Sequence, residues 1–404
     1  MPAAWPSPEG APLVLEGLRT PLARAGTLFA GVPVHELLAP VLSTLVDRAG
    51  GSAEDVADVV IGNAAGGGGN LARLAALTAG LPERLPGITV DQQCGSGLDA
   101  IVLACRLVQA GAGAAYLAGG AESVSTAPVR GRRRPDGSLE FYRRAQHAPS
   151  VAGAAEPTDP DMGFAAETVA REAGVSRERQ DAFALRSHAR ALGAAASGAF
   201  DGELVAVRAP GAEDWVTADN GPRARLDARL LARFPAAFVP GGTVTAGNSC
   251  SDADGAAATL VAGPGSGLAP RPGCAALAFL GAETVGVDPR RLGLGAAAAA
   301  ERLLARHGVP AGEVSAIEFN EAFAGQVLAC TDRLGLAGED LDRVLNTEGG
   351  ALALGHAYGA SGAVSVVRLL ARAQRLPAGS LCLAMISSAG GIGTAALFAT
   401  VRTP

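Results

Sequence analysis

The alternation of two kinds of segment constrains the fold of this chain more than any other feature of its sequence. Short apolar runs, such as VADVVIG, GITVDQQ and AAYLAGG, alternate with longer Ala/Leu-rich stretches, such as LARLAALTAG and LDAIVLACRLVQAG. The first kind is typical of buried strands and the second of helices. Their alternation is the pattern of βαβ units, in which helices cover a mainly parallel sheet. The sequence therefore predicts an α/β fold.

A similarity between two parts of the chain indicates a duplication. CGSGLDAIVLACRLVQAG leads into AAYLAGGAES, and GHAYGASGAVSVVRLLARAQ leads into SLCLAMISSAGG. Each unit has a reactive residue, a turn of small residues, a helix and a strand that ends in glycines. Glycines at such turns would let backbone N–H groups face a negative charge. Chance similarity in an Ala/Gly-rich chain is the alternative interpretation.

Between these units, residues 127–242 break into Pro, Gly and charged residues, which predicts a loop-rich insertion. Near its start lies an arginine cluster around Phe141 and Tyr142, made of Arg130, Arg132, Arg133, Arg134, Arg143 and Arg144. Such a cluster is suited to the phosphates of a nucleotide-bearing ligand. A solvated surface loop is the other interpretation.

Length, charge and cysteine spacing limit the possible classes. A chain of 404 residues suggests two or three domains or one large duplicated one. The net charge of -6 provides no general attraction to nucleic acid or to an anionic membrane. No apolar run is long enough to span a bilayer and no leader pattern is present, so we expect a cytoplasmic enzyme. The six dispersed cysteines form no C-x-x-C pair, which predicts neither a metal site nor disulfides.

Cys94 is the first candidate for chemistry. In TVDQQCGSG a strand ends at this cysteine and turns into a helix. The positive end of the helix dipole is expected to lower the pKa of the thiol and so to favour the thiolate. A structural role is the alternative for any single cysteine.

His356 is the second candidate, because it lies among glycines in NTEGGALALGHAYGASG, again before a helix. A cysteine paired with a histidine is a common nucleophile and base. Most of the other four histidines (His35, His147, His188 and His307) are better interpreted as surface or packing residues. A third candidate, Asn320 in AIEFNEAFAGQVLA, would orient a water or donate to an oxyanion, or would cap the helix that follows.

These segments occur together in an order that resembles the thiolase family. RTPLARAGTLF, GNAAGGGGNLAR, CGSGLDA, LAGGAES, MGFAAETVARE, GTVTAGN, NEAFA and GGALALGHAYGASG all look like thiolase signatures. The resemblance implies a duplicated αβαβα layered fold with two mixed, largely parallel sheets and a loop-rich insertion. It implies an N-terminal half at 1–126, completed by about 243–280, a loop domain at 127–242 over the coenzyme A (CoA) site, and a C-terminal half at 281–404.

The resemblance also implies a ping-pong acyl transfer. Cys94 would be acylated by an acyl-CoA, with His356 as its base, and a water on Asn320 would help to hold the oxygen of the second thioester. Residues implied along the substrate are Met162, Ala246, Ser249, Cys250 and Phe323. No cofactor is implied beyond the CoA thioester itself. The expected assembly is a homodimer or a dimer of dimers.

The sequence departs from the family pattern near its end. Thiolases carry a second cysteine in a C-x-G-G-G-x-G loop that moves the α-proton, and the matching stretch here is SSAGGIG. Ser387 stands in place of that cysteine and Ala389, before Gly390, in place of a glycine whose N–H faces the acyl oxygen. A serine hydroxyl is a much weaker base than a thiolate near neutral pH.

These departures leave three functions open. The first is a thiolase that makes or cleaves 3-ketoacyl-CoA with altered α-proton transfer. The second is a specialised acyltransferase or hydrolase that forms acyl-Cys94 but uses another acceptor. The third is a weakly active thiolase-like subunit of a complex.

Overall fold

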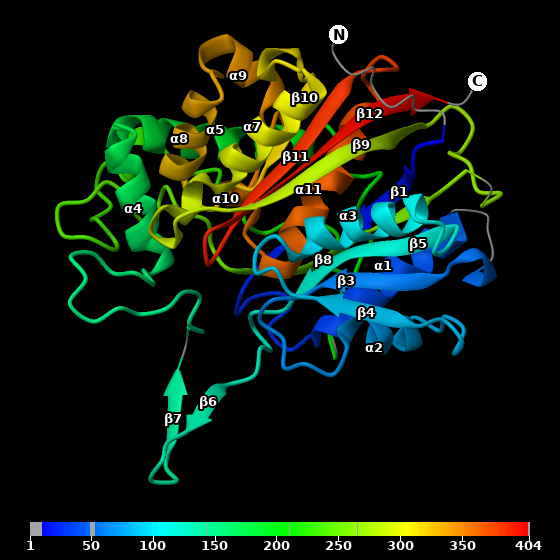
Figure 1. Cartoon of the computed structure of the whole chain (residues 1–404), viewed down its shortest axis with the longest axis horizontal. Coiled ribbons are helices and arrows are strands. Elements are labelled where there is room, and N and C mark those ends of the chain that lie inside the picture. Colours follow the sequence, from blue (N-terminus) through cyan, green and yellow to red (C-terminus); the bar gives the residue numbers. More distant parts are fainter. Residues whose placement is uncertain (1–9, 49–52, 143, 210, 265, 403–404) are drawn as a thin grey trace.

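The computed structural model describes residues 10–48, 53–142, 144–209, 211–264 and 266–402 (Figure 1). The first half of the fold contains six strands and three α-helices among these residues. They are β1 (Leu13–Arg19), β2 (Ala23–Arg24), α1 (Val34–Arg48), β3 (Asp58–Gly62), α2 (Leu71–Thr78), β4 (Gly87–Val90), α3 (Ser96–Gln109), β5 (Ala115–Glu122) and β8 (Ala253–Ala262), with a 3₁₀ turn at Ala53–Asp55.

The second half begins at β9. Its elements are β9 (Ala275–Gly286), a 3₁₀ segment (Pro289–Leu294), α7 (Gly295–His307), a 3₁₀ turn (Ala311–Glu313), β10 (Ala316–Phe319), α8 (Ala324–Arg333), α9 (Gly338–Val344), α10 (Ala351–Leu354), α11 (Tyr358–Ala373), β11 (Leu381–Ser388) and β12 (Ile392–Arg402). Of the segment 243–280, β8 lies in the first half of the sheet and β9 in the second. No helix in the described chain is long and apolar enough to cross a membrane.

The strand order shows the predicted duplication. One ten-stranded sheet runs β10-β11-β12-β9-β1-β8-β5-β3-β4, with β2 beside β8. Each half can be followed outward from the centre of the sheet. The first half has the order β1-β8-β5-β3-β4, and the second half has the matching order β9-β12-β11-β10. The place of β4 is taken in the second half by a single parallel bridge from Ile317 to Leu345. The internal similarity of the sequence therefore marks two copies of one topology.

The α/β class and the mixed sheet are confirmed, with two differences in detail. The two expected sheets are hydrogen-bonded into one, because Leu13 and Val14 of β1 pair with β9. Among the named strands of the described sheet, β3 pairs parallel with β4 and β5, and β10 with β11. The inner strands pair antiparallel, as between β11 and β12, which the short turn at 389–391 joins directly.

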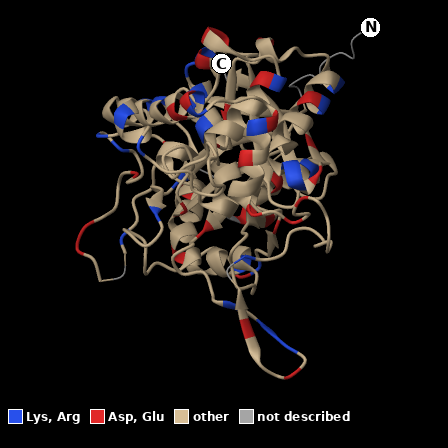
Figure 2. Cartoon of the chain, turned by 90° about the vertical axis from the view of Figure 1, so that its left-hand side faces the viewer, with Lys and Arg blue, Asp and Glu red and all other residues tan. Residues whose placement is uncertain are grey.

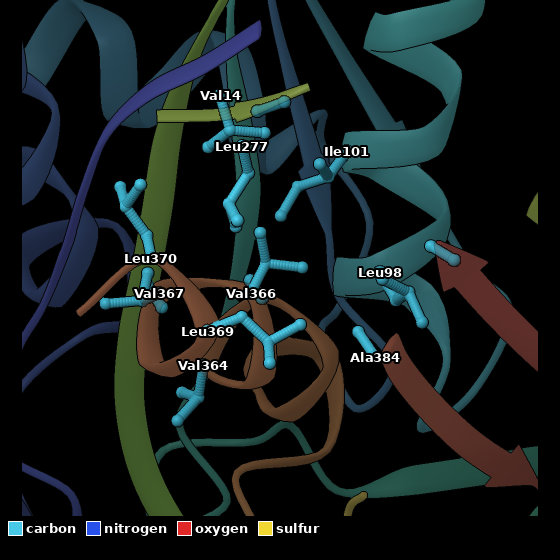
Figure 3. Close-up of a cluster of buried hydrophobic side chains, with 14 of the residues drawn as sticks. Val14, Leu98, Ile101, Leu277, Val364, Val366, Val367, Leu369, Leu370 and Ala384 are labelled. Atoms are coloured by element: carbon cyan, nitrogen blue, oxygen red, sulfur yellow. The ribbon is translucent and has the colours of Figure 1, made fainter. Parts of the chain in front are cut away.

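Five layers follow from the alternation of side chains along the strands. In β5, Tyr116 faces the central helices α3 and α11, while Leu117 faces α1 and α2. In β11, Ile386 faces the same central pair, while Leu383 faces the outer helices of the second half. Figure 3 shows the central cluster, where side chains of α3 and α11 meet those of both halves of the sheet. The predicted αβαβα layering is thus present.

The segment 127–242 leaves the two halves of the sheet. It forms a hairpin that projects from the body as an arm, followed by long loops and helices (Figure 1). Its elements are β6 (Arg130–Arg133), β7 (Leu139–Tyr142), α4 (Met162–Glu172), α5 (Arg177–Ala196) and α6 (Ala228–Leu231). The arm carries charges of both signs (Figure 2). The insertion therefore contains more regular secondary structure than its composition indicated.

The two central helices touch at glycines near their N-terminal ends. A Cβ atom on Gly97 of α3 would lie 2.5 Å from the carbonyl oxygen of Gly359 in α11. A Cβ atom on Gly120 of β5 would lie 1.9 Å from the same oxygen. Real Cβ atoms do not approach backbone this closely, so these positions require glycine. The contact fixes the starts of α3 and α11 beside each other.

We expect Gly97→Ala to lower the free energy of unfolding by about 1–3 kcal/mol or more, because the added methyl group must displace backbone. Urea denaturation would measure this change. The control is Gly193→Ala in α5, where an added Cβ meets no atom within 4 Å. That variant should be stabilised by about 0.5–1 kcal/mol, as for other helical glycines. Equal effects at the two positions would contradict the role given to the contact.

Candidate active site

Cys94 lies on a strained turn between β4 and α3. Gln93, immediately before it, has φ of 55°, which is uncommon for a residue other than glycine. The hydroxyl of Ser96 holds this turn, since it accepts from the N–H of Gln92 at 2.8 Å and donates to the carbonyl of Gln93 at 2.6 Å. The serine of the CGSG motif therefore positions the thiol.

His356 occupies the equivalent place before α11. Gly355, just before it, has φ of 99°, which favours glycine. The backbone of His356 is anchored on both sides, by its N–H to the carbonyl of Ser251 at 2.8 Å and by its carbonyl to the N–H of Ala253 at 3.2 Å. The GTVTAGN region and the histidine loop are thus held together as a short parallel bridge.

Cys94 and His356 line the same cavity, which has a volume of about 420 Å³. One wall is apolar, where the rings of Phe238 and Phe323 meet edge to face with centroids 6.0 Å apart. The duplication explains this meeting, because each residue lies two positions before one of the paired helices. The predicted proximity of the two side chains is consistent with this shared cavity.

The hydrogen bonds of His356 define its tautomer. Its Nδ1 lies 2.6 Å from the hydroxyl oxygen of Ser361, and that hydroxyl donates to the carbonyl of Ala357 at 3.0 Å. Since the single hydroxyl proton is used there, Nδ1 carries the proton that it donates to Ser361. Nε2 then keeps its lone pair, and this atom is buried without a partner among the described residues.

The expected low pKa of Cys94 is wrong for the unliganded protein. Burial raises the pKa of the thiol to about 12, against a smaller lowering by the N–H groups of Ala389 and of Cys94 itself. The negative charges of Glu122 and Asp252 raise it further. Desolvation of the thiolate therefore outweighs the helix terminus, and the resting residue is a thiol that needs a base.

His356 has the properties of that base. Burial lowers the pKa of its imidazole to about 4, so the ring is neutral at pH 7. A neutral ring with a free Nε2 lone pair can accept the thiol proton as the sulfur attacks, since the raised thiol pKa and the lowered imidazole pKa disfavour transfer before the attack. The ring is also only 3% exposed, which limits competition from bulk water.

Other predicted residues divide between this cavity and other places. Met162, Ser249, Cys250, Phe323, Ser387 and Ala389 line it. Ala246 is exposed and Gly390 lies against the carbonyl of His147, and neither is among the described lining residues. For Cys250, burial raises the pKa of the thiol, which favours its interpretation as a packing residue.

Asn320 lies beside a smaller cavity of about 30 Å³, which Ser361 also lines. Its amide nitrogen is buried and has no partner among the described residues. A cavity of this size holds about one water molecule. The expected water on Asn320 therefore has room next to the serine that orients His356, and its role in catalysis stays a prediction.

Matches to known proteins agree with this geometry. Residues 13–263 match the family model described as "Thiolase, N-terminal domain", and residues 275–400 match "Thiolase, C-terminal domain". The chain belongs to the thiolase family. Its acyltransferase class follows from this membership and from its named relatives.

Two curated relatives and one solved structure resemble this thiolase over nearly its whole length. "Putative acetyl-CoA C-acetyltransferase YhfS" of Bacillus subtilis is 39% identical and "Putative acetyl-CoA C-acetyltransferase VraB" of Staphylococcus haemolyticus 41%, each over 96% of this chain and 98% of the relative. The crystal structure of the Bacillus anthracis acetyl-CoA acetyltransferase is 31% identical, with a TM-score of 0.85, and covers 97% of this chain and 99% of that one.

Ser387 is bound to backbone on both sides in this thiolase. Its hydroxyl donates to the carbonyl of Gly293 at 2.8 Å and accepts from the N–H of Ala296 at 2.9 Å. Both partners belong to the start of the α7 region. The hydroxyl thus has a structural role, in addition to being a weak base.

Three residues of the site were not singled out from the sequence. Asp252 and Tyr358 line the cavity and bond to each other at 2.5 Å, and Ser361 orients His356. The signal for Ser361 was its place in GASG, five positions after the histidine. Asp252 and Tyr358 carry no comparable signal in a single sequence. In the described chain, no group of three or more His, Cys, Asp or Glu side chains is arranged to hold a metal ion.

The arginines of the predicted cluster lie in two different environments. Arg132 and Arg134 pair with Glu140 on the exposed arm, whereas Arg130 and Arg144 line a second cavity together with Cys94. Arg143 lies outside the described residues. Part of the cluster is therefore surface, and part lies next to the nucleophile.

We expect alkylation of Cys94 by iodoacetamide to speed up about tenfold per pH unit between roughly pH 7 and pH 10, with no plateau, because a thiol with a pKa of about 12 is mostly protonated throughout this range. Mass spectrometry of the Cys94 peptide would give the rates. In urea-unfolded protein the rate should level off near the ordinary thiol pKa of about 8.5. A plateau below pH 9 in the folded protein would contradict the raised pKa.

Proposed function

We propose that this thiolase forms an acyl-Cys94 intermediate from an acyl-CoA and makes or cleaves 3-ketoacyl-CoA. The observation that carries the proposal is the shared cavity, in which a protonated Cys94 thiol and the unpartnered Nε2 of a neutral His356 are both present. The acetyl-CoA C-acetyltransferase names of the relatives support the same reaction class.

In the acylation step, His356 takes the thiol proton on Nε2 while the Cys94 sulfur attacks the thioester carbon. The carbonyl oxygen becomes an oxyanion near the N–H groups of Cys94 and Ala389. Both N–H groups already lower the pKa of the Cys94 thiol. Prearranged donors of this kind each contribute a few kcal/mol to the transition state. The CoA sulfur then leaves as a thiol by taking the proton from His356.

The second half-reaction requires removal of an α-proton from another acyl-CoA, followed by attack of that carbon on acyl-Cys94. In the family pattern a cysteine at the position of Ser387 handles this proton. Here the serine hydroxyl is engaged with Gly293 and Ala296, which supports slow α-proton transfer at this residue. Acylation needs no α-proton transfer and should be unaffected.

The proposal includes the position of the CoA site, the absence of a further cofactor, the cellular location and the assembly. The segment 127–242 would cover the CoA site, with Met162 and the Phe238–Phe323 wall along the pantetheine arm. The enzyme would need no cofactor beyond the CoA thioester. It would act in the cytoplasm as a homodimer or a dimer of dimers, in fatty acid metabolism.

The contacts of Ser387 also favour a second candidate. An acyltransferase or hydrolase could use the acyl-Cys94 step and pass the group to an acceptor that needs no α-proton removal. Such an enzyme would acylate Cys94 as described and would show no α-proton exchange. The shared cavity of Cys94 and His356 is the observation that speaks against an inactive subunit.

Acetyl-CoA should add one acetyl group to Cys94, since the base and the two N–H donors are in place. Intact-protein and peptide mass spectrometry would locate the added mass. Cys94→Ala should abolish it, whereas Cys274→Ser, at a partly exposed cysteine outside the cavity, should leave it intact. Absence of the added mass with acetyl-CoA and with longer acyl-CoAs would refute the proposal.

Ser387→Cys should increase exchange of the α-protons of acetyl-CoA into D2O at least tenfold, because a thiol has a pKa much closer to neutral than a hydroxyl. The substitution should also destabilise the fold by about 1–3 kcal/mol, since two hydrogen bonds are weakened. Ser387→Ala is the control, because it removes both hydrogen bonds and adds no thiol. Unchanged exchange in Ser387→Cys would place the α-proton base at another residue.

A further inference from the structure

Cys94 also lines a second cavity. This cavity has a volume of about 260 Å³, and His356 is not among its described lining residues. Asp161, Met162, Tyr358 and Ala389 also line both spaces, so the two cavities adjoin around the nucleophile. One cavity would receive the CoA arm under the proposed function, and the other then remains for the acyl group.

The second cavity carries a cation without a counterion. Arg130, the first residue of β6, donates one hydrogen bond to the carbonyl of Ala64 at 3.1 Å. It forms no ion pair with any residue in the described part of the chain. Its neighbours on the arm differ, because Arg132 and Arg134 both pair with Glu140. The remaining N–H groups of Arg130 are therefore available to a ligand.

Two buried polar atoms beside Arg130 also lack partners. The guanidinium of Arg144 pairs with Asp159, yet its Nε is buried with no partner among the described residues. The Nδ1 atom of His147 is also buried and has no partner among the described residues. Buried polar atoms are rarely left unsatisfied, so these two atoms indicate a polar partner, such as a water molecule, that the described residues do not supply.

Charged side chains of both signs line this cavity, where Arg130 is the cation without an ion pair among the described residues and Asp161 is the acidic side chain. Asp159 is neutralised by Arg144, and the carboxylate of Asp161 accepts from the N–H of Gly163 at 3.1 Å. The pKa of His147 is lowered by burial first and then by Arg144, with a further lowering by Arg130, whereas Asp159 and Asp91 have the opposite effect. His147 is thus neutral at pH 7 and able to donate or accept a hydrogen bond.

The phosphates of CoA are unsuited to this position. A whole pantetheine arm separates them from the thioester, and the thioester must lie at Cys94 for reaction. A cation that lines the same small cavity as this thiol is therefore placed for the acyl group. Arginine recognises carboxylates through two parallel N–H donors.

We propose that Arg130, with Arg144 and His147, binds a carboxylate at the far end of the acyl chain, so that the preferred substrates are CoA esters of dicarboxylic acids. The proposal rests on the proposed acylation of Cys94. It adds a substrate class to that reaction. It also gives a role to residues that the sequence indicated as a phosphate-binding cluster or a surface loop.

Binding can be measured apart from catalysis in the unreactive Cys94→Ala background. Isothermal titration of glutaryl-CoA and valeryl-CoA compares the same chain length with and without a carboxylate. Glutaryl-CoA should bind about tenfold to a hundredfold more tightly, as expected for one charge-assisted interaction. Added Arg130→Gln should remove most of this preference, whereas Arg133→Gln, at an exposed site on the same strand, should preserve it.

Pantetheine thioesters of the same two acids separate the carboxylate from the phosphates. If the carboxylate is the ligand, the preference for the glutaryl compound persists without the phosphates. The inference is wrong if valeryl-CoA binds as well as glutaryl-CoA, or if Arg130→Gln weakens both CoA esters equally and leaves both pantetheine thioesters unchanged. Failure of acetyl-CoA to acylate native Cys94 would instead refute the proposed function, which is a separate measurement.

Discussion

The arrangement of this protein depends on the contact between α3 and α11. Gly97 and Gly120 leave room for the backbone of Gly359, and no other residue type fits at those distances. Because Cys94 and His356 each immediately precede one of these helices, the contact that closes the central layer also brings thiol and imidazole into one cavity. The buried carboxylate of Glu122 strengthens the junction, since it accepts from the side chain of Asn63 at 2.7 Å and from the N–H of Gly359 at 3.0 Å. The same contact therefore serves both the packing of the core and the assembly of the site.

Much of this was predictable because the patterns are local. The runs that indicated strands and helices between Val56 and Gly120 became β3, α2, β4, α3 and β5 in that order. The internal similarity corresponded to a real repeat of topology, and the two glycine-flanked reactive residues line one cavity. Each of these features depends on spacing and residue type within a short window, which a single sequence displays.

The rest depends on neighbours that are distant in the sequence. Proximity to a helix terminus suggested an acidic thiol at Cys94, but burial by several segments dominates and raises its pKa to about 12. The engagement of Ser387 with Gly293 and Ala296 joins positions more than ninety residues apart. Likewise, nothing local distinguishes Arg130 from Arg132, although one lines a cavity with Cys94 and the other is on the exposed arm. Desolvation and pairing of this kind require the assembled fold.

The position of Cys94 between two adjoining cavities bears on how enzymes of this design diversify. Phe238 and Phe323 line the cavity that contains His356 and are not among the described lining residues of the second cavity. Arg130 and His147 line the second cavity and are not among those of the first. Substitutions at the second group can change which acids are accepted while recognition of the carrier and the reacting atoms stay as they are. If the acyl group binds in the second cavity as proposed, the acid that is accepted and the reacting atoms are determined by largely separate sets of residues.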